Sequence, residues 1–113
     1  MLRPTVALVM IAAGPALGDA TALCVERATA SRAQCDCATQ SLRDAVDPET
    51  LALFDAVAGS ALRFRADGLS RRLAWEEGIV AVATERGLGI TDLLNRMNPV
   101  DRTHRAAIEA CAG

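Results

Sequence analysis

The stretch that decides the fold runs from residue 47 to residue 68 and reads DPETLALFDAVAGSALRFRADG. Its start carries three helix signals in a row. Asp47 can cap the first turn, Pro48 fits the first helical position, and Glu49 suits the positive end of the helix dipole. An Asp-Gly pair ends the stretch. Between these ends, one stripe of side chains recurs at helical spacing: Leu51, Phe54, Ala58, Ala61 and Arg65, with Leu62 beside it. The stretch therefore predicts a long helix.

Similar signals continue on the C-terminal side of this helix. Ser70 is a candidate cap for a helix over residues 71–86. Thr91 then caps a short helix, and the Asn-Pro pair at 98–99 repeats the pattern of a cap followed by proline. We therefore expect the chain to break at residues 98–99 and a last helix to end near Cys111.

On the N-terminal side, residues 23–33 are rich in alanine, and residues 37–46 have Ala38, Leu42 and Ala45 at helical spacing. No strand-like alternation, Asn-Gly or Asp-Gly hairpin signal or internal repeat accompanies these segments. The predicted fold class is all-α, a small bundle of about five short helices stapled by two disulfides. This domain is expected to occupy residues 21–113.

Four cysteines support the two staples: Cys24, Cys35, Cys37 and Cys111. An even number of cysteines in a small exported chain indicates disulfides formed in an oxidising compartment. A bridge between Cys35 and Cys37 would close a very tight ring, so each of them should reach another cysteine. We expect Cys24–Cys35 and Cys37–Cys111, and the alternative exchanges the two partners.

The first twenty residues are expected to be a cleaved signal peptide. Arg3 gives a short positive start, residues 5–13 (TVALVMIAA) form an apolar run, and Gly14 and Pro15 follow. This run is much shorter than the roughly 20 apolar residues that span a bilayer. Small residues allow a cut after Gly18 or Ala20. A lipid on Cys24 is disfavoured because leucine precedes it. The expected localisation is the periplasm or the exterior, with no membrane contact after cleavage.

The composition narrows the classes of partner. The formal net charge is −2, and all twelve basic residues are arginine. A mildly acidic exported chain is a poor candidate for nucleic-acid binding.

Four arginines flank the turn after the long helix: Arg63, Arg65, Arg71 and Arg72. Arg63 and Arg65 suit a helix C-terminus, whereas Arg71 and Arg72 in a first turn oppose the helix dipole by a few tenths of a kcal/mol. This local conflict predicts a site for an anionic ligand or an acidic protein partner. The alternative is a solvated face on which Arg72 pairs with Glu76.

Cys35, Cys37 and His104 allow a second hypothesis. Two thiolates and an imidazole suit a soft metal such as Cu(I) or zinc, and the same cysteine pair could act as a redox dithiol. The spacing of the two cysteines departs from the usual zinc and redox motifs, and oxidised cysteines would remove both roles.

No catalytic motif or cofactor motif stands out, and no nucleophile lies beside His104 in the sequence. The leading hypothesis is a small exported, non-enzymatic binding or accessory protein, without a cofactor, that acts through a partner surface. The alternative is a thiol-redox or soft-metal protein that uses Cys35 and Cys37.

Overall fold

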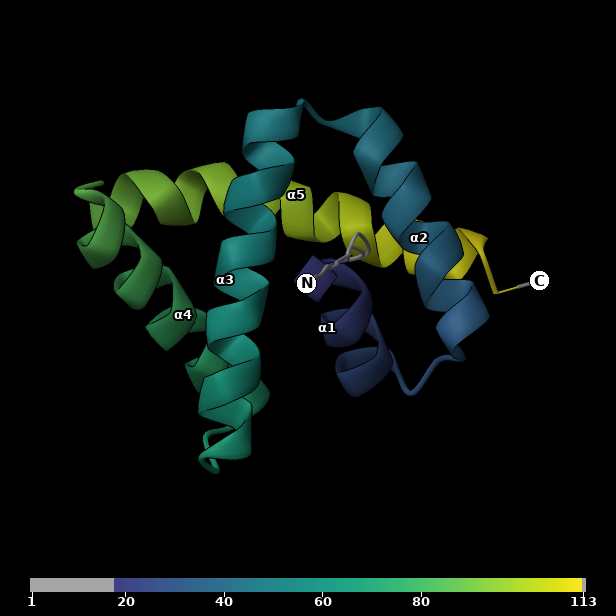
Figure 1. Cartoon of the computed structure of the whole chain (residues 1–113), viewed down its shortest axis with the longest axis horizontal. Coiled ribbons are helices and arrows are strands. Elements are labelled where there is room, and N and C mark those ends of the chain that lie inside the picture. The colour runs from purple at the N-terminus through teal and green to yellow at the C-terminus, as the bar shows by residue number, and fades with distance from the viewer. Residues whose placement is uncertain (1–17, 113) are drawn as a thin grey trace, which may run out of the picture.

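The computed structural model describes residues 18–112. Within them the chain forms five α-helices and no strand, and two disulfides join the helices (Figure 1). The all-α class and the two staples are therefore confirmed. The helices are α1 (Gly18–Ala28), α2 (Arg32–Ala45), α3 (Pro48–Ala66), α4 (Arg71–Arg86) and α5 (Ile90–Ala110).

Side-chain caps fix the starts of three helices. The hydroxyls of Ser31 and Ser70 and the carboxylate of Asp47 each accept a hydrogen bond from the backbone N–H three residues on. Asp47 also accepts the hydroxyl of Thr50 at 2.6 Å, and these bonds lower the pKa of its carboxyl. The expected starts of α3 and α4 are thus confirmed.

The first two helices both start five residues before the predicted segments 23–33 and 37–46, although α2 ends only one residue before its predicted end. α1 already ends at Ala28, Thr29 takes a positive φ of 50°, and Ser31 starts α2. The predicted signal peptide falls on residues 1–20, of which 1–17 lie outside the described part. Its last three residues, 18–20, form the first turn of α1.

The expected break at residues 98–99 was wrong, because α5 runs through Pro99 without interruption. Proline inside a helix removes one backbone hydrogen bond and costs about 3 kcal/mol. Met97 and Val100 are buried on either side of it and hold both segments of α5 against the core. This burial offsets the cost of the proline, and the chain gains one long helix in place of two short ones.

Figure 1 shows α3 and α4 side by side at one end of the molecule, α1 and α2 at the other, and α5 running past both. α3 and α4 approach closely at Gly78, where a Cβ would lie 3.1 Å from the carbonyl oxygen of Val57. α5 packs against α4 near its start and against α2 near its end.

The buried side chains form two clusters. The larger cluster centres on Phe54 of α3 and contains most of the large apolar residues: Leu23, Leu42, Leu53, Val57, Ile79, Val82, Leu93, Met97 and Val100. The smaller cluster lies where α1, α2 and the end of α5 meet, and consists of Cys24, Cys35, Ala38, Ala107 and Ile108.

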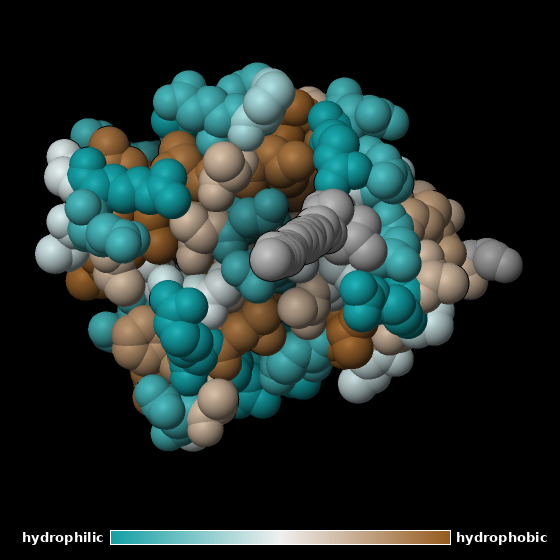
Figure 2. Space-filling view, in the orientation of Figure 1, coloured by the Kyte–Doolittle hydropathy of each residue, from teal (hydrophilic) through white to brown (hydrophobic). Residues whose placement is uncertain are grey.

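The surface mixes hydrophilic and hydrophobic residues on the face that Figure 2 shows. The large apolar side chains that are exposed are Val25, Leu73, Val80, Leu88 and Ile90. None of the helices in residues 18–112 combines the length and the apolar character needed to cross a bilayer.

Candidate functional site

The cysteines are used in pairs between helices. Cys24 of α1 is bonded to Cys35 of α2, and Cys37 of α2 is bonded to Cys111 at the end of α5. This is the first of the two expected pairings. In residues 18–112 no cysteine is free.

These bonds separate the residues of the proposed dithiol and metal site. Cys35 and Cys37 are joined to different partners, so they do not form a redox pair with each other. A disulfide sulfur is also not the thiolate that a soft metal binds. Within the described residues, no group of three or more His, Cys, Asp or Glu side chains could hold a metal ion.

His104 lies in the core and not at a metal site. Its side chain is completely buried, and neither ring nitrogen has a hydrogen-bond partner. The ring meets Phe54 edge to face, with centroids 5.2 Å apart. Burial and, to a smaller extent, the positive charge of Arg27 together lower the pKa of His104 to about 4. His104 is therefore neutral at pH 7.

The structure divides the arginine cluster predicted around the α3–α4 turn. Arg63 donates to the hydroxyl of Ser60 at 3.0 Å. Arg65 donates to a carboxylate oxygen of Glu26 at 2.9 Å and to the carbonyl oxygen of residue 69 at 2.8 Å. Both guanidiniums thus donate hydrogen bonds to groups of the same chain. Arg71 and Arg72, by contrast, line a groove together with residues that the sequence did not single out.

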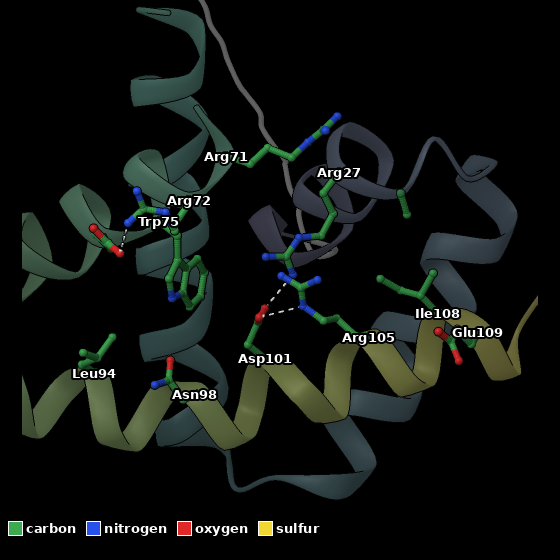
Figure 3. Close-up of a pocket in the computed structure, with 12 residues that line it drawn as sticks. Arg27, Arg71, Arg72, Trp75, Leu94, Asn98, Asp101, Arg105, Ile108 and Glu109 are labelled. Atoms are coloured by element: carbon green, nitrogen blue, oxygen red, sulfur yellow. Dashed lines mark hydrogen bonds and ion pairs between the residues drawn. The ribbon is translucent and has the colours of Figure 1, made fainter. Parts of the chain in front are cut away.

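This groove lies between the end of α1, the first turns of α4 and one side of α5 from Leu94 to Glu109 (Figure 3). Its volume is about 790 Å³. Its lining combines four arginines, three carboxylates and an apolar surface: Arg27, Ala28, Arg71, Arg72, Trp75, Glu76, Leu94, Asn98, Asp101, Arg105, Ile108 and Glu109. We call it the α1–α4–α5 groove.

One carboxylate in the groove serves two arginines. The carboxylate of Asp101 on α5 accepts a hydrogen bond from Arg27 of α1 at 2.6 Å. It accepts a second one at 3.0 Å from Arg105, which lies one turn further along α5 (Figure 3). Arg27 and Asp101 are nearly buried, with side chains 11% and 14% exposed, whereas Arg105 is 61% exposed. These three side chains have two positive charges and one negative charge, so their net charge is +1. The exposed guanidinium is that of Arg105.

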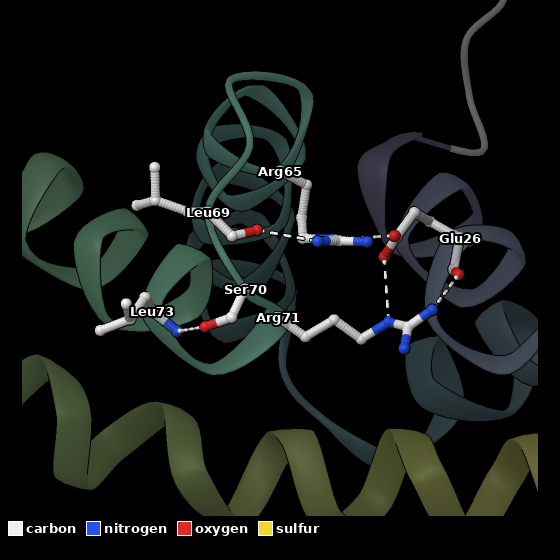
Figure 4. A network of polar contacts seen from close by, with 6 residues as sticks. All are labelled: Glu26, Arg65, Leu69, Ser70, Arg71 and Leu73. Carbon is white, nitrogen blue, oxygen red and sulfur yellow. Dashed lines mark hydrogen bonds and ion pairs between the residues drawn. The ribbon is translucent and has the colours of Figure 1, made fainter.

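A second shared carboxylate lies at the α4 side of the groove. Glu26 of α1 binds Arg65, and its other oxygen lies 3.7 Å from Nε of Arg71 (Figure 4). Arg71 also donates to the carbonyl oxygen of Glu26 at 3.3 Å and stays 57% exposed. This trio likewise has one uncompensated positive charge. The pair of Arg72 with Glu76, which belonged to the alternative interpretation of a solvated face, forms at 3.0 Å and is neutral.

Trp75 supplies an aromatic surface in the groove. Its indole is half-buried, stands 5.7 Å from the ring of Phe54, and has the guanidinium of Arg27 over it at 5.8 Å. Together with Leu94 and Ile108 it makes part of the groove apolar.

The comparisons add no relative to this description. No family model matches the chain, and no curated protein and no solved structure matches it either. The geometry and charge of the groove are therefore the observations that bear on function.

Proposed function

We propose that this protein is an exported, non-enzymatic binding protein that holds an acidic segment of a partner protein in the α1–α4–α5 groove. Export is supported by the apolar run at residues 5–13 with its small-residue cleavage pattern, and by two disulfides of the kind that form in oxidising compartments.

The observation that carries the proposal is the sharing of carboxylates. Asp101 and Glu26 each lie between two guanidinium groups, so each trio has an excess positive charge. The exposed member of each trio, Arg105 or Arg71, lines the groove and has donor groups left for a carboxylate from outside.

The rest of the lining indicates the occupant. Trp75 and Leu94 line the groove on one side of the contact between Asp101 and Arg105, and Ile108 lines it on the other side (Figure 3). A segment that carries acidic residues and an apolar side chain would pair its carboxylates with Arg71 and Arg105 and bury its apolar group on the tryptophan. Both guanidiniums remain largely exposed, which suits a partner lying across the surface more than a small enclosed ligand.

Trp75 is the single tryptophan of the chain, so its fluorescence reports directly on the groove. A short peptide of alternating glutamate and leucine should change this fluorescence saturably. The affinity should fall as the salt concentration rises from about 0.05 to about 0.5 M, because exposed charges are then screened. A control peptide with glutamine in place of glutamate should bind at least about tenfold more weakly.

The matched variants test the two arginines. The double variant Arg71→Gln, Arg105→Gln should bind the acidic peptide about tenfold more weakly or worse. Combining Arg86→Gln with Arg102→Gln removes the same charge from exposed positions of α4 and α5 outside the groove, and should retain most of the affinity. Equal binding by the two double variants, or by the two peptides, would refute the proposal. If free glutamate bound as tightly as the peptide, the ligand of the groove would be a small anion and not a segment of a partner protein.

A further inference from the structure

The first turn of α1 lies against Asp55 of α3. The backbone N–H of Ala20 donates to Oδ1 of Asp55 at 2.9 Å. Gly18 has a left-handed φ of 63°, and a Cβ there would lie 2.9 Å from Oδ2 of the same carboxylate. The carboxylate thus lies against the backbone at Gly18 and at Ala20, and the backbone nitrogen of Asp19 lies along the chain between these two positions.

This corner of the molecule has more negative than positive charge. Asp55 is half-buried, and the second carboxylate, that of Asp19, packs beside it against Gly59. Burial raises the pKa of Asp55, and the nearby charge of Asp19 raises it further. The hydrogen bond from Ala20 and the positive charge of Arg43 on α2 act in the opposite direction. Two carboxylates therefore face one guanidinium.

The sequence places a cleavage pattern at the same point. Ala16-Leu17-Gly18 satisfies the small-x-small rule and follows the apolar run, so the bond from Gly18 to Asp19 is a candidate for cleavage. A cut after Ala20 would remove a completely buried residue whose N–H is bonded to Asp55. A cut after residue 22 would also remove Thr21, whose hydroxyl lies 2.6 Å from that of Thr39.

We propose that the Gly18–Asp19 bond is the processing site of the chain, and that the α-ammonium group created on Asp19 forms an ion pair with Asp55. Water adds across the peptide bond in a reaction carried out by an export-linked peptidase. The leader leaves with a carboxylate on Gly18, and the domain keeps an amine that takes up a proton. A neutral N–H beside Asp55 is thereby replaced by a positive charge, which brings the corner to two carboxylates and two cations. The inference rests on the proposed export.

The first measurement is the mass of the protein recovered after export of the full chain. It should correspond to a chain that begins at Asp19. A chain that still begins at Met1 would contradict both the export and this site. A chain that begins at Thr21 or Leu23 would leave the export standing and overturn this site.

The second measurement is the pKa of the new amine. Because the chain has no lysine, this α-amine is the only primary amine, and its rate of acetylation against pH gives its pKa without interference. An ordinary α-amine has a pKa of about 7.7 to 8.0, and the pair with Asp55 should raise it by about one unit.

Two controls separate the pairing from other effects. Asp55→Asn should return the pKa of the amine to the ordinary range, whereas Asp67→Asn, at the far end of α3, should leave it raised. The same assay on wild-type protein unfolded in urea should also give the ordinary value, which keeps the test decisive if Asp55→Asn does not fold. A native wild-type amine with an ordinary pKa would overturn the ion pair.

Discussion

The two ends of this molecule are held together by different means. At the α3–α4 end, large side chains pack around Phe54, and in the described residues no disulfide reaches either helix. Where α1, α2 and the end of α5 meet, the buried cluster consists of two cysteines, two alanines and one isoleucine, and both disulfides lie in this region.

This difference has a simple energetic reason. Hydrophobic stabilisation scales with buried apolar area at about 25 cal/mol per Å², so alanines contribute little and aromatic and branched side chains contribute much. A region that contains mostly small side chains needs another source of stability, and a cross-link that restricts the unfolded chain supplies it. The α1–α4–α5 groove lies between the two regions, with α4 on one side and α1 on the other.

The largest effect should come from removing the longer bridge. Cys37 and Cys111 are 74 residues apart, and replacing both by alanine should cost about 4.5 kcal/mol of unfolding free energy. Replacing Cys24 and Cys35, which are 11 residues apart, should cost about 3 kcal/mol from loop entropy. Urea unfolding of the oxidised proteins measures both. Costs below about 1 kcal/mol would mean that the small-residue region is stable without its bridges.

The next effect concerns the other end. Phe54→Ala should cost about 4 kcal/mol, because it empties the centre of the larger cluster. Leu73→Ala on the exposed side of α4 is the control and should cost less than about 0.5 kcal/mol. If the two variants were equally stable, the packed core would not be what holds α3 and α4.

A third effect depends on pH. His104 has a folded-state pKa of about 4, below its unfolded value of about 6.5, so the unfolded chain binds the extra proton in this window. Stability is therefore complete above pH 6.5 and falls as the pH drops towards 4, by about 3 kcal/mol. The loss between pH 7 and pH 4 should be smaller by this amount in His104→Leu. Parallel curves for variant and wild type would show that the imidazole is not buried and neutral.

The smallest effect tests the contact that joins α1 to α5. Asp101→Asn removes the charge that holds the nearly buried Arg27 and should cost about 1 to 2 kcal/mol in urea unfolding. Arg32→Gln breaks the exposed pair with Asp36 inside α2 and should cost at most about 0.5 kcal/mol. If Asp101→Asn cost no more than this control, the contact between Arg27 and Asp101 would not stabilise the packing of α1 against α5.

Local signals predicted the start of α3 and α4, since Asp47 and Ser70 act on their own first turns. They failed at Pro99, where a local rule favours a break and burial of Met97 and Val100 on both sides overrides it. The strain in a ring between Cys35 and Cys37 excluded one of the three cysteine pairings, but it left open which of the two residues bonds to Cys24. The predicted start of α2 was five residues late because the cap at Ser31 was not recognised, and that of α1 was late because residues 18–20 were assigned to the signal peptide.

The sequence predicted only some of the residues that line the groove. The conflict of Arg71 and Arg72 with the helix dipole drew attention to them, and both line the groove. The pair of Asp101 with Arg105 has the spacing of one helical turn and could have been noticed. Arg27 meets Asp101 across 74 residues, and no local pattern announces such a contact.

The most direct test of the proposed binding site is hydrogen exchange of the oxidised protein with and without the glutamate–leucine peptide. Backbone amides on both sides of the groove should gain protection from exchange: those at the end of α1, in the first turns of α4 and along α5, with little change in α2. Protection confined to one of the two regions, or centred on α2, would contradict a binding site between them.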